Sequence, residues 1–350
     1  MERQETILSV KDLEVQFTLR GQVLTAIRGV SLDVYRGESL AIVGESGSGK
    51  SVFTKTFMGM LDKNGRVTAG EILYKGRDLA KYTTSGEWQK IRGGEIAMVF
   101  QDPMTSLNPL KTVGKQIQEA VELHQGLRGR AAREKTIGYL ADVGISSPEI
   151  RYKQYPHEFS GVMRQRAVIA ATMACNPEIL ICDEPTTALD VTIQAQIIEL
   201  LKEMQKKYSL TIIYITHDLG VVARVADRVA VMYAGDIIEI GTSCDIFYNA
   251  RHPYTWALLS SLPQLGIKGQ PLFSIRGTPP NLFRKIEGDA FAPRNPQALK
   301  IDHLIRPPYF DVSPTHKVRS WLEDPRAPET EPPETVKKMM SRGKEVQKDV

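Results

Sequence analysis

Residues 40–51 of this 350-residue chain read LAIVGESGSGKS, a short apolar run followed by a loop of glycine and serine. The last eight residues fit the pattern GxxxxGK[ST], in which glycines let backbone N–H groups converge on phosphate oxygens and the helix that follows presents its positive end. Lys50 would add a positive charge at the β- and γ-phosphates, and the Ser51 hydroxyl would ligate Mg²⁺. The candidate phosphate-binding residues are Gly44, Glu45, Ser46, Gly47, Ser48, Gly49, Lys50 and Ser51.

The flanking residues support this interpretation over an ordinary Gly/Ser turn with a stray lysine. An apolar strand (40–43) precedes the loop, and a helical pattern follows it. This strand–loop–helix context is the one in which such a loop binds phosphate. The sequence therefore predicts a nucleotide site at this point of an α/β fold.

A second strand, residues 179–184 (ILICDE), ends in two carboxylates. Asp183 is suited to contact Mg²⁺, and Glu184 is suited to act as a general base on an attacking water. Seen alone, a pair of acidic residues could simply cap the turn after a strand. Together with the loop at 44–51, it predicts hydrolysis of a nucleoside triphosphate.

The pattern of apolar residues divides the chain into regions. Short strand patterns occupy residues 7–43, with a further strand pair at 70–76, and a Glu/Lys/Arg-rich helical insertion covers 104–157. From residue 160, strands alternate with helices, which favours a mostly parallel, doubly wound sheet. After residue 263 prolines become frequent, and the Pro/Glu/Lys-rich stretch from 324 predicts a disordered tail.

Composition excludes several classes of protein. Lys and Arg total 45 against 41 Asp and Glu, and this net charge of +4 is too small for a protein that coats nucleic acid. The 3 cysteines form no CxxC pair, which indicates free thiols in a reducing compartment. No apolar run approaches the 20 or so residues that a bilayer requires, and the N-terminus lacks the apolar region of a signal peptide, so we expect the chain to stay where it is made.

Further motifs stand in a fixed order around these two elements. They are Gln101 after IAMVF, the segment 159–166 (FSGVMRQR), Ala188-Leu189-Asp190 and Thr216-His217-Asp218. This ordered set resembles the ATP-binding-cassette (ABC) ATPases over residues 7 to about 262. The resemblance implies an α/β fold with a RecA-like core, an antiparallel β-subdomain and a helical subdomain.

The resemblance also assigns roles to particular residues. It implies that 44–51 is the Walker A motif, that Asp183 and Glu184 are Walker B and the catalytic carboxylate, and that ATP and Mg²⁺ are bound. Ser51, Gln101 and Asp183 would serve the metal. Gln101 is implied as the Q-loop glutamine, His217 as the switch histidine at the γ-phosphate, Asp190 as the D-loop aspartate, and Ser160, Gly161, Val162 and Met163 as the signature. Phe17 stands where an aromatic ring stacks on adenine, although a phenylalanine in a core strand is an equal interpretation.

Finer resemblances point to one branch of these ATPases. QDPMTSLNPL (101–110), RHPYTWALLSSLP (251–263), GTPP (277–280) and GDAFAPRNPQAL (288–299) are similar to the ATPase subunits of oligopeptide/dipeptide (peptide/nickel) importers, on the D side of a D/F pair. This implies an ATP hydrolase that energises peptide uptake from the cytoplasmic face of the membrane. Its implied partners are two permease subunits, a second, F-type ATPase and an extracytoplasmic peptide-binding protein, with no nucleic acid.

The resemblance fixes an expected domain layout. Residues 1–262 would form the nucleotide-binding domain, with the helical subdomain at about 104–162. Residues 263–323 would form the C-terminal extension of this branch, and 324–350 the tail.

Two departures from the branch pattern carry hypotheses. The signature has Val162 where a second glycine is usual, and its branched side chain would crowd a surface that phosphate must approach. One of two composite ATP sites would then be impaired, or the substitution is tolerated. Four cysteines that hold an iron–sulfur cluster in many relatives correspond here to Asp289, Asn295, Asp302 and Ser320, so we expect no cluster.

The alternative function is a soluble ABC-type ATPase acting in DNA repair or on ribosomes. Repair-type cassettes carry a very long coiled coil between the Walker A motif and the signature, whereas Lys50 and Ser160 here are only 160 − 50 = 110 residues apart. Ribosome-associated types usually hold two cassettes in one chain. A P-loop switch protein would need a base-reading NKxD, which is absent from the sequence.

Overall fold

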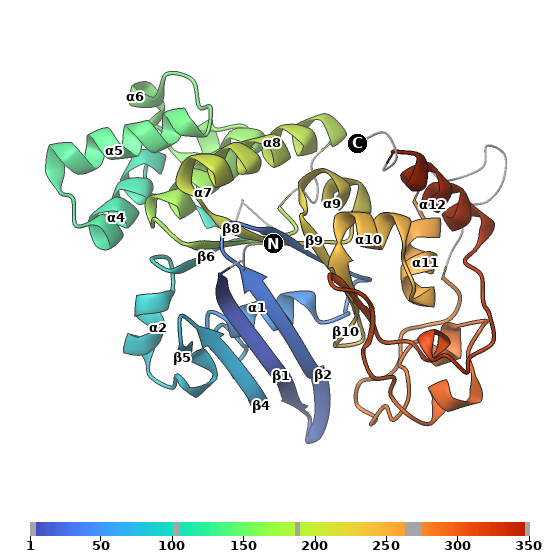
Figure 1. Ribbon diagram of the computed structural model, residues 1–350. Helices are drawn as coiled ribbons and strands as arrows, with labels where there is room; N and C mark the ends of the chain where they lie inside the picture. Colours follow the sequence, from blue (N-terminus) through green and yellow to red (C-terminus); the bar gives the residue numbers. More distant parts are fainter. Residues whose placement is uncertain (1–4, 101–105, 186–189, 263–274, 347–350) are drawn as a thin grey trace. The chain divides into compact units, whose positions relative to one another are not determined.

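The structure is a computed structural model that describes residues 5–100, 106–185, 190–262 and 275–346. The chain forms two compact units (Figure 1). The first unit joins residues 1–80 to 216–350, and the second unit is the continuous segment 81–215. The phosphate loop therefore belongs to the first unit and the acidic strand end to the second.

The elements follow the order in which Figure 1 labels them. The strands are β1 (Thr6–Leu19), β2 (Gln22–Tyr35), β3 (Ser39–Val43), β4 (Gly65–Tyr74), β5 (Arg77–Asp78), β6 (Ile96–Val99), β7 (Ile179–Asp183), β8 (Thr211–Thr216), β9 (Arg228–Tyr233), β10 (Asp236–Thr242), β11 (Phe310–Ser313) and β12 (His316–Val318). The helices are α1 (Lys50–Thr56), α2 (Ser85–Ile91), α4 (Val113–Gln125), α5 (Gly129–Asp142), α6 (Pro148–Arg151), α7 (Gly161–Ala174), α8 (Val191–Tyr208), α9 (Leu219–Val225), α10 (Ser243–Tyr248), α11 (Pro253–Ser260) and α12 (Glu334–Val346).

An antiparallel sheet in the order β2-β1-β4-β5 forms one layer of the first unit. Its long strands alternate buried apolar and outward polar side chains, so one face packs against the interior of the unit. Leu8, Leu13 and Ile27 are fully buried on that face. This sheet is the antiparallel β-subdomain that the resemblance implied.

The other strands of the first unit position the phosphate loop. β3 pairs in parallel with β9, and β9, β10, β12 and β11 continue as antiparallel neighbours. All five residues of β3 are buried, as expected for a strand covered on both faces. The loop between β3 and α1 begins at the carboxyl end of β3, which is the edge where ligands bind in open α/β sheets.

The second unit contains the parallel strands β6, β7 and β8, with β7 in the middle. β7 and β8 are buried throughout, and β7 carries Asp183 at its end. Helices α4, α5 and α6 lie within the region expected to be helical, and both α4 and α5 pack against α7. The parallel strands and this helical group confirm the α/β fold class.

The C-terminal part differs from the expected disordered tail. Residues 334–346 form α12, which packs against α10 and α11 of the same unit. Val336 is fully buried there, and the Thr335 and Ser260 hydroxyls lie 3.2 Å apart. Prolines, glutamates and lysines dominate the composition from residue 324 onward, which is why the sequence predicted disorder. The helix nevertheless carries a short apolar stripe, and this stripe packs against the rest of the unit.

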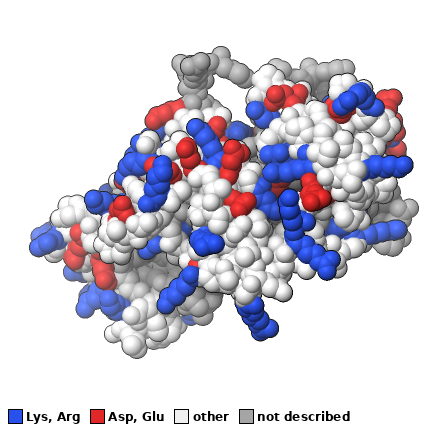
Figure 2. Space-filling view, turned by 90° about the horizontal axis from the view of Figure 1, so that it is seen from below, with Lys and Arg blue, Asp and Glu red and all other residues white. Residues whose placement is uncertain are grey.

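On the face shown in Figure 2, basic and acidic side chains are interspersed. Among the described residues, no helix has both the length and the apolar content needed to cross a bilayer.

Candidate functional site

The loop after β3 is held in a conformation that glycine permits. Gly44 has φ of +154°, and a Cβ atom there would lie 2.1 Å from the carbonyl oxygen of Met232 on β9. Gly49 has φ of +103° and precedes α1 directly. A side chain at either position would therefore push the loop away from the strands that support it.

Lys50 is the basic group of this loop. Its side chain is buried, with 6% exposed, and its ammonium group donates to the carbonyl oxygens of Gly44 (2.8 Å) and Glu45 (2.9 Å). Ser46 and Gly47 are exposed, whereas Ser48 is buried. The lysine therefore lies against the loop that it serves, and the exposed residues are open to a ligand.

Asp183 and Glu184 lie at the end of β7 in the second unit. Asp183 is buried, and Glu184 is partly exposed and donates its backbone N–H to the carbonyl of Ile215 on β8 (2.9 Å). Glu184 has φ of +46°, a left-handed backbone conformation that few residues other than glycine adopt. Such strain gathers at functional sites, and no pattern in the sequence indicated it.

The signature segment begins a helix, as its resemblance implied. Ser160 is exposed and caps α7, because its hydroxyl accepts the backbone N–H of Met163 (3.3 Å). Gly161 is exposed, and Val162 is half-buried in the first turn. Valine is thus compatible with the helical backbone here.

A hydrogen bond joins the signature helix to the acidic strand end within the second unit. The buried side chain of Gln165, on α7, donates to the carbonyl of Pro185 (3.0 Å), the residue after Glu184. Gln165 was not among the predicted site residues. Its position five residues after Ser160 gave no sign that it would reach the turn after β7.

The other predicted site residues fall in loops at helix starts. His217 is exposed, and the next residue, Asp218, caps α9 by accepting the N–H groups of Gly220 and Val221. Asp190 caps α8 through the N–H of Ile193 (2.9 Å). Gln101 lies outside the described residues. The catalytic and binding roles of these residues stay predictions.

Phe17 lies near the end of β1 and is partly exposed. It pairs with Leu24 of β2 and with Gly65 of β4. A Cβ atom on Gly65 would come within 2.4 Å of the Phe17 ring, so the ring covers this glycine. Stacking of the other ring face on adenine stays a prediction.

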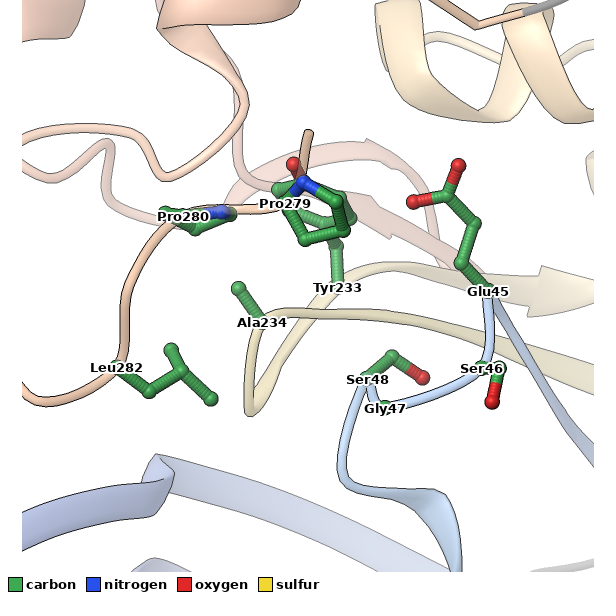
Figure 3. Close-up of a pocket in the computed structure, with 9 residues that line it drawn as sticks. All are labelled: Glu45, Ser46, Gly47, Ser48, Tyr233, Ala234, Pro279, Pro280 and Leu282. Atoms are coloured by element: carbon green, nitrogen blue, oxygen red, sulfur yellow. The ribbon is translucent and has the colours of Figure 1, made fainter. Parts of the chain in front are cut away.

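A contact that sequence reasoning missed links the C-terminal extension to the phosphate loop. The Arg294 guanidinium donates to both oxygens of the Glu45 carboxylate, at 2.7 and 3.1 Å. The partners are 249 positions apart, so no local pattern could reveal the pair. Beside this contact, the loop and the GTPP segment line a cavity of about 30 Å³ (Figure 3).

The four positions expected to lack cluster-binding cysteines all bind backbone amides. Asn295, Asp302 and Ser320 are buried residues, and Asp289 is partly exposed although its side chain is only 7% exposed. The side chains of Asp289, Asn295, Asp302 and Ser320 accept N–H groups from Phe291, Gln297, Leu299 and Leu322 respectively. Burial, together with the nearby carboxylate of Asp302, raises the pKa of Asp289 to about 7, although its bond from Phe291 opposes the shift. These side chains stabilise turns of the extension, and the absence of a cluster stays a prediction.

The nucleotide-binding part of the chain is similar to known ATP-binding cassettes. Residues 27–187 match the family described as ABC transporter. The structure is similar to that of the ATP-binding cassette MJ0796 in a dimeric, post-hydrolysis state with ADP and Pi (TM-score 0.59, 26% identity, 67% of this chain and 98% of that one). It is also similar to cbiO1 of Clostridium perfringens, part of the ABC transporter complex cbiONQ (TM-score 0.61, 30% identity, 70% of this chain and 91% of that one). The fold is therefore that of an ABC ATPase.

A second family match and relatives that cover nearly the whole chain identify the branch. Residues 238–301 match the family described as oligopeptide/dipeptide transporter, C-terminal region. The chain is 56% identical to the oligopeptide transport ATP-binding protein AmiE of Streptococcus pneumoniae (94% of this chain, 93% of that protein) and 55% identical to OppD of Bacillus subtilis (98% and 96%). It is 52% identical to the dipeptide transport ATP-binding protein DppD of Lactococcus lactis (99% of each). The chain belongs to the ATP-binding subunits of oligopeptide/dipeptide ABC transporters.

Proposed function

We propose that this chain hydrolyses ATP to energise the import of oligopeptides across the cytoplasmic membrane, bound peripherally at the cytoplasmic face. The observation that carries this proposal is the glycine loop closed by buried Lys50, in a chain whose transport relatives match it from end to end. The C-terminal family match adds a region that belongs to the peptide transporter branch.

The proposed chemistry assigns the predicted site residues to the hydrolysis of one ATP molecule. The amides of the loop 44–49 bind the phosphates, and Lys50 exchanges its bonds to loop carbonyls for phosphate oxygens. Glu184 orients or deprotonates the attacking water, and His217 and Gln101 contact the γ-phosphate side. Because a phosphoryl group spreads negative charge in the transition state, positioning and charge neutralisation supply most of the catalysis.

The donor set fits Mg²⁺. Ser51 supplies a hydroxyl at the start of α1, and Asp183 supplies a buried carboxylate at the end of β7, both of them oxygen ligands of the type that Mg²⁺ prefers. Gln101 would supply an amide oxygen. When bound, the ion neutralises charge on the β- and γ-phosphates.

A second cassette completes each site in the proposed assembly. The segment Ser160 to Met163, whose first two residues are exposed, would contact ATP held by a second, F-type ATPase. That subunit's own signature would close the site at Lys50. Two permease subunits and an extracytoplasmic peptide-binding protein complete the transporter. The dimeric state in which the similar cassette MJ0796 was solved supports such pairing.

The experiment is to purify the tagged full-length chain from membranes and measure ATPase activity of the complex in liposomes. We expect two permeases and a second ATPase to accompany it, and turnover to rise when peptide-loaded binding protein is added. Turnover that does not respond to loaded binding protein, or that responds to DNA or ribosomes instead, would refute peptide import. No observation favours the DNA-repair or ribosome alternative.

A further inference from the structure

Glu45, the second residue of the phosphate loop, is held on three sides. Its backbone N–H donates to the Tyr254 hydroxyl of α11 (2.8 Å), and its carbonyl accepts from Lys50 (2.9 Å). Its carboxylate accepts two bonds from Arg294, at 2.7 and 3.1 Å. Every polar group of this residue is therefore used. Its carbonyl is bonded from within the loop, by Lys50 and by the backbone N–H of Ser48 (3.2 Å), whereas its N–H and its carboxylate are bonded to α11 and to the extension.

Arg294 is itself fixed in place. Its side chain is only 5% exposed, and it also donates to the Tyr233 hydroxyl (3.1 Å) and to the carbonyl of Arg276 (2.9 Å). Its guanidinium lies over the rings of Tyr233 and Phe291, 5.8 and 5.9 Å from their centroids. The planar Arg294 guanidinium is held firmly and makes two bonds to the Glu45 carboxylate. It therefore fixes the direction of that carboxylate as well as neutralising its charge.

The surrounding rings hold the extension in place without Arg294. Tyr233 of β9, Tyr254 of α11 and Phe291 of the extension contact one another with centroids 4.5 to 5.4 Å apart. The extension is also bonded to β2, where the N–H of Thr25 donates to the carbonyl of Leu282 (3.2 Å). Loss of the Arg294 side chain therefore removes its bonds to the loop, while these ring contacts and the bond between Thr25 and Leu282 remain.

The extension also lines the far side of the cavity beside the loop. In Figure 3, Pro279, Pro280 and Leu282 face Gly47 and Ser48 across it, while the Glu45 carboxylate points away from Ser48. The segment 276–294 thus lies next to the loop at two places, across this cavity and at the Arg294–Glu45 pair. The contact at Arg294 is the charged one of the two.

We propose that Arg294 is a positioning residue for the nucleotide site, holding Glu45 so that the loop presents its amides to the phosphates of ATP and ADP. The C-terminal extension thereby sets nucleotide affinity through a single ion pair. This inference rests on the proposed phosphate-binding role of the loop.

The test measures equilibrium binding of ADP and ATP to the full-length chain by fluorescence titration. We expect Arg294→Gln and Glu45→Gln each to weaken binding about tenfold, since a partly buried, charge-assisted contact is lost. The double variant should be no weaker than either single variant. Arg294→Lys, which keeps the charge and a donor, should restore part of the affinity. The matched control is Arg326→Gln, which removes an exposed arginine paired with Asp324 in the same C-terminal region.

The outcomes separate this inference from the proposed function. If the wild-type chain binds no nucleotide, or Lys50→Ala binds as well as wild type, the proposed function fails. If Lys50→Ala abolishes binding while the Arg294 and Glu45 variants bind like the Arg326 control, only this inference fails. A lower melting temperature with unchanged affinity would likewise assign Arg294 a purely structural role. Arg294→Lys and Glu45→Gln conserve size, so they keep the test valid if Arg294→Gln does not fold.

Discussion

The backbone of Glu184 adopts φ of +46° between a buried strand residue and a proline. This backbone conformation costs a residue with a side chain about 1–2 kcal/mol. The neighbouring strand β8 holds Glu184 in it, because the Glu184 N–H donates to the carbonyl of Ile215. This conformation is the feature that separates the two acidic residues, because Asp183 stays buried within β7 and Glu184 turns outward to a partly exposed position.

Val162 carries a prediction at the scale of one residue. Its side chain occupies the first turn of α7, on the segment proposed to contact ATP bound to the partner ATPase. If this branched side chain obstructs that phosphate, the site that uses the partner's catalytic carboxylate is the impaired one. Removing Glu184 should then abolish turnover of the complex, while removing the partner's equivalent should have a much smaller effect. Equal losses in the two single variants would show that valine is tolerated.

At the scale of elements, capping determines where the signature helix starts. Ser160→Ala removes the hydroxyl that accepts the Met163 N–H and should lower the free energy of unfolding by about 1 kcal/mol. Ser160→Asp keeps a capping oxygen and serves as the control. Denaturant unfolding of the isolated chain measures both. A loss as large for the aspartate variant would mean that the cap is not the cause.

Helix α12 gives a second prediction at this scale. Val336 is fully buried against the first unit, whereas Lys338 on the same helix is exposed. Val336→Asp places a charge in that contact and should detach the helix, which amide hydrogen exchange over residues 334–341 would report as rapid exchange. Lys338→Asp should leave exchange as in wild type. Equal protection in both variants would contradict the packing.

These elements show what could be predicted from the sequence. The segment of β3, loop and α1, the acidic end of β7 and the helices of the insertion follow from apolar periodicity and glycine placement, which are local signals. The left-handed Glu184, the docked α12 and the pair Glu45–Arg294 depend on contacts between distant parts of the chain. No local pattern encodes such contacts, so sequence reasoning missed all three.

At the scale of the whole molecule, a buried carboxyl links stability to pH. Burial raises the pKa of Asp289 to about 7, above its usual value near 4, so the folded chain binds a proton that the unfolded chain has lost between these pH values. The contribution of Asp289 to the free energy of unfolding therefore falls as pH rises from about 4 to about 7. Burial lowers the pKa of the neighbouring His252 to about 4, so its contribution to the free energy of unfolding rises with pH up to its usual pKa near 6.5 and opposes that of Asp289.

Asp289→Asn isolates the contribution of Asp289. It keeps the oxygen that accepts the Phe291 N–H but cannot titrate. Its stability relative to wild type should rise steadily from pH 5 to pH 7, by up to about 1.4 kcal/mol per pH unit. Denaturant unfolding at several pH values measures the difference. A constant difference across this range would show that Asp289 is ionised in the folded chain.

The most direct measurement of the central claim is ATP binding and turnover by Glu184→Gln in the assembled transporter. Because the loop and Lys50 are intact, this variant should bind MgATP as tightly as wild type. Without its general base it should turn over at least a hundredfold more slowly, within the range of general-base catalysis. Turnover at the wild-type rate would contradict the assignment of Glu184, and with it the proposal that this strand end and the phosphate loop serve one ATP molecule.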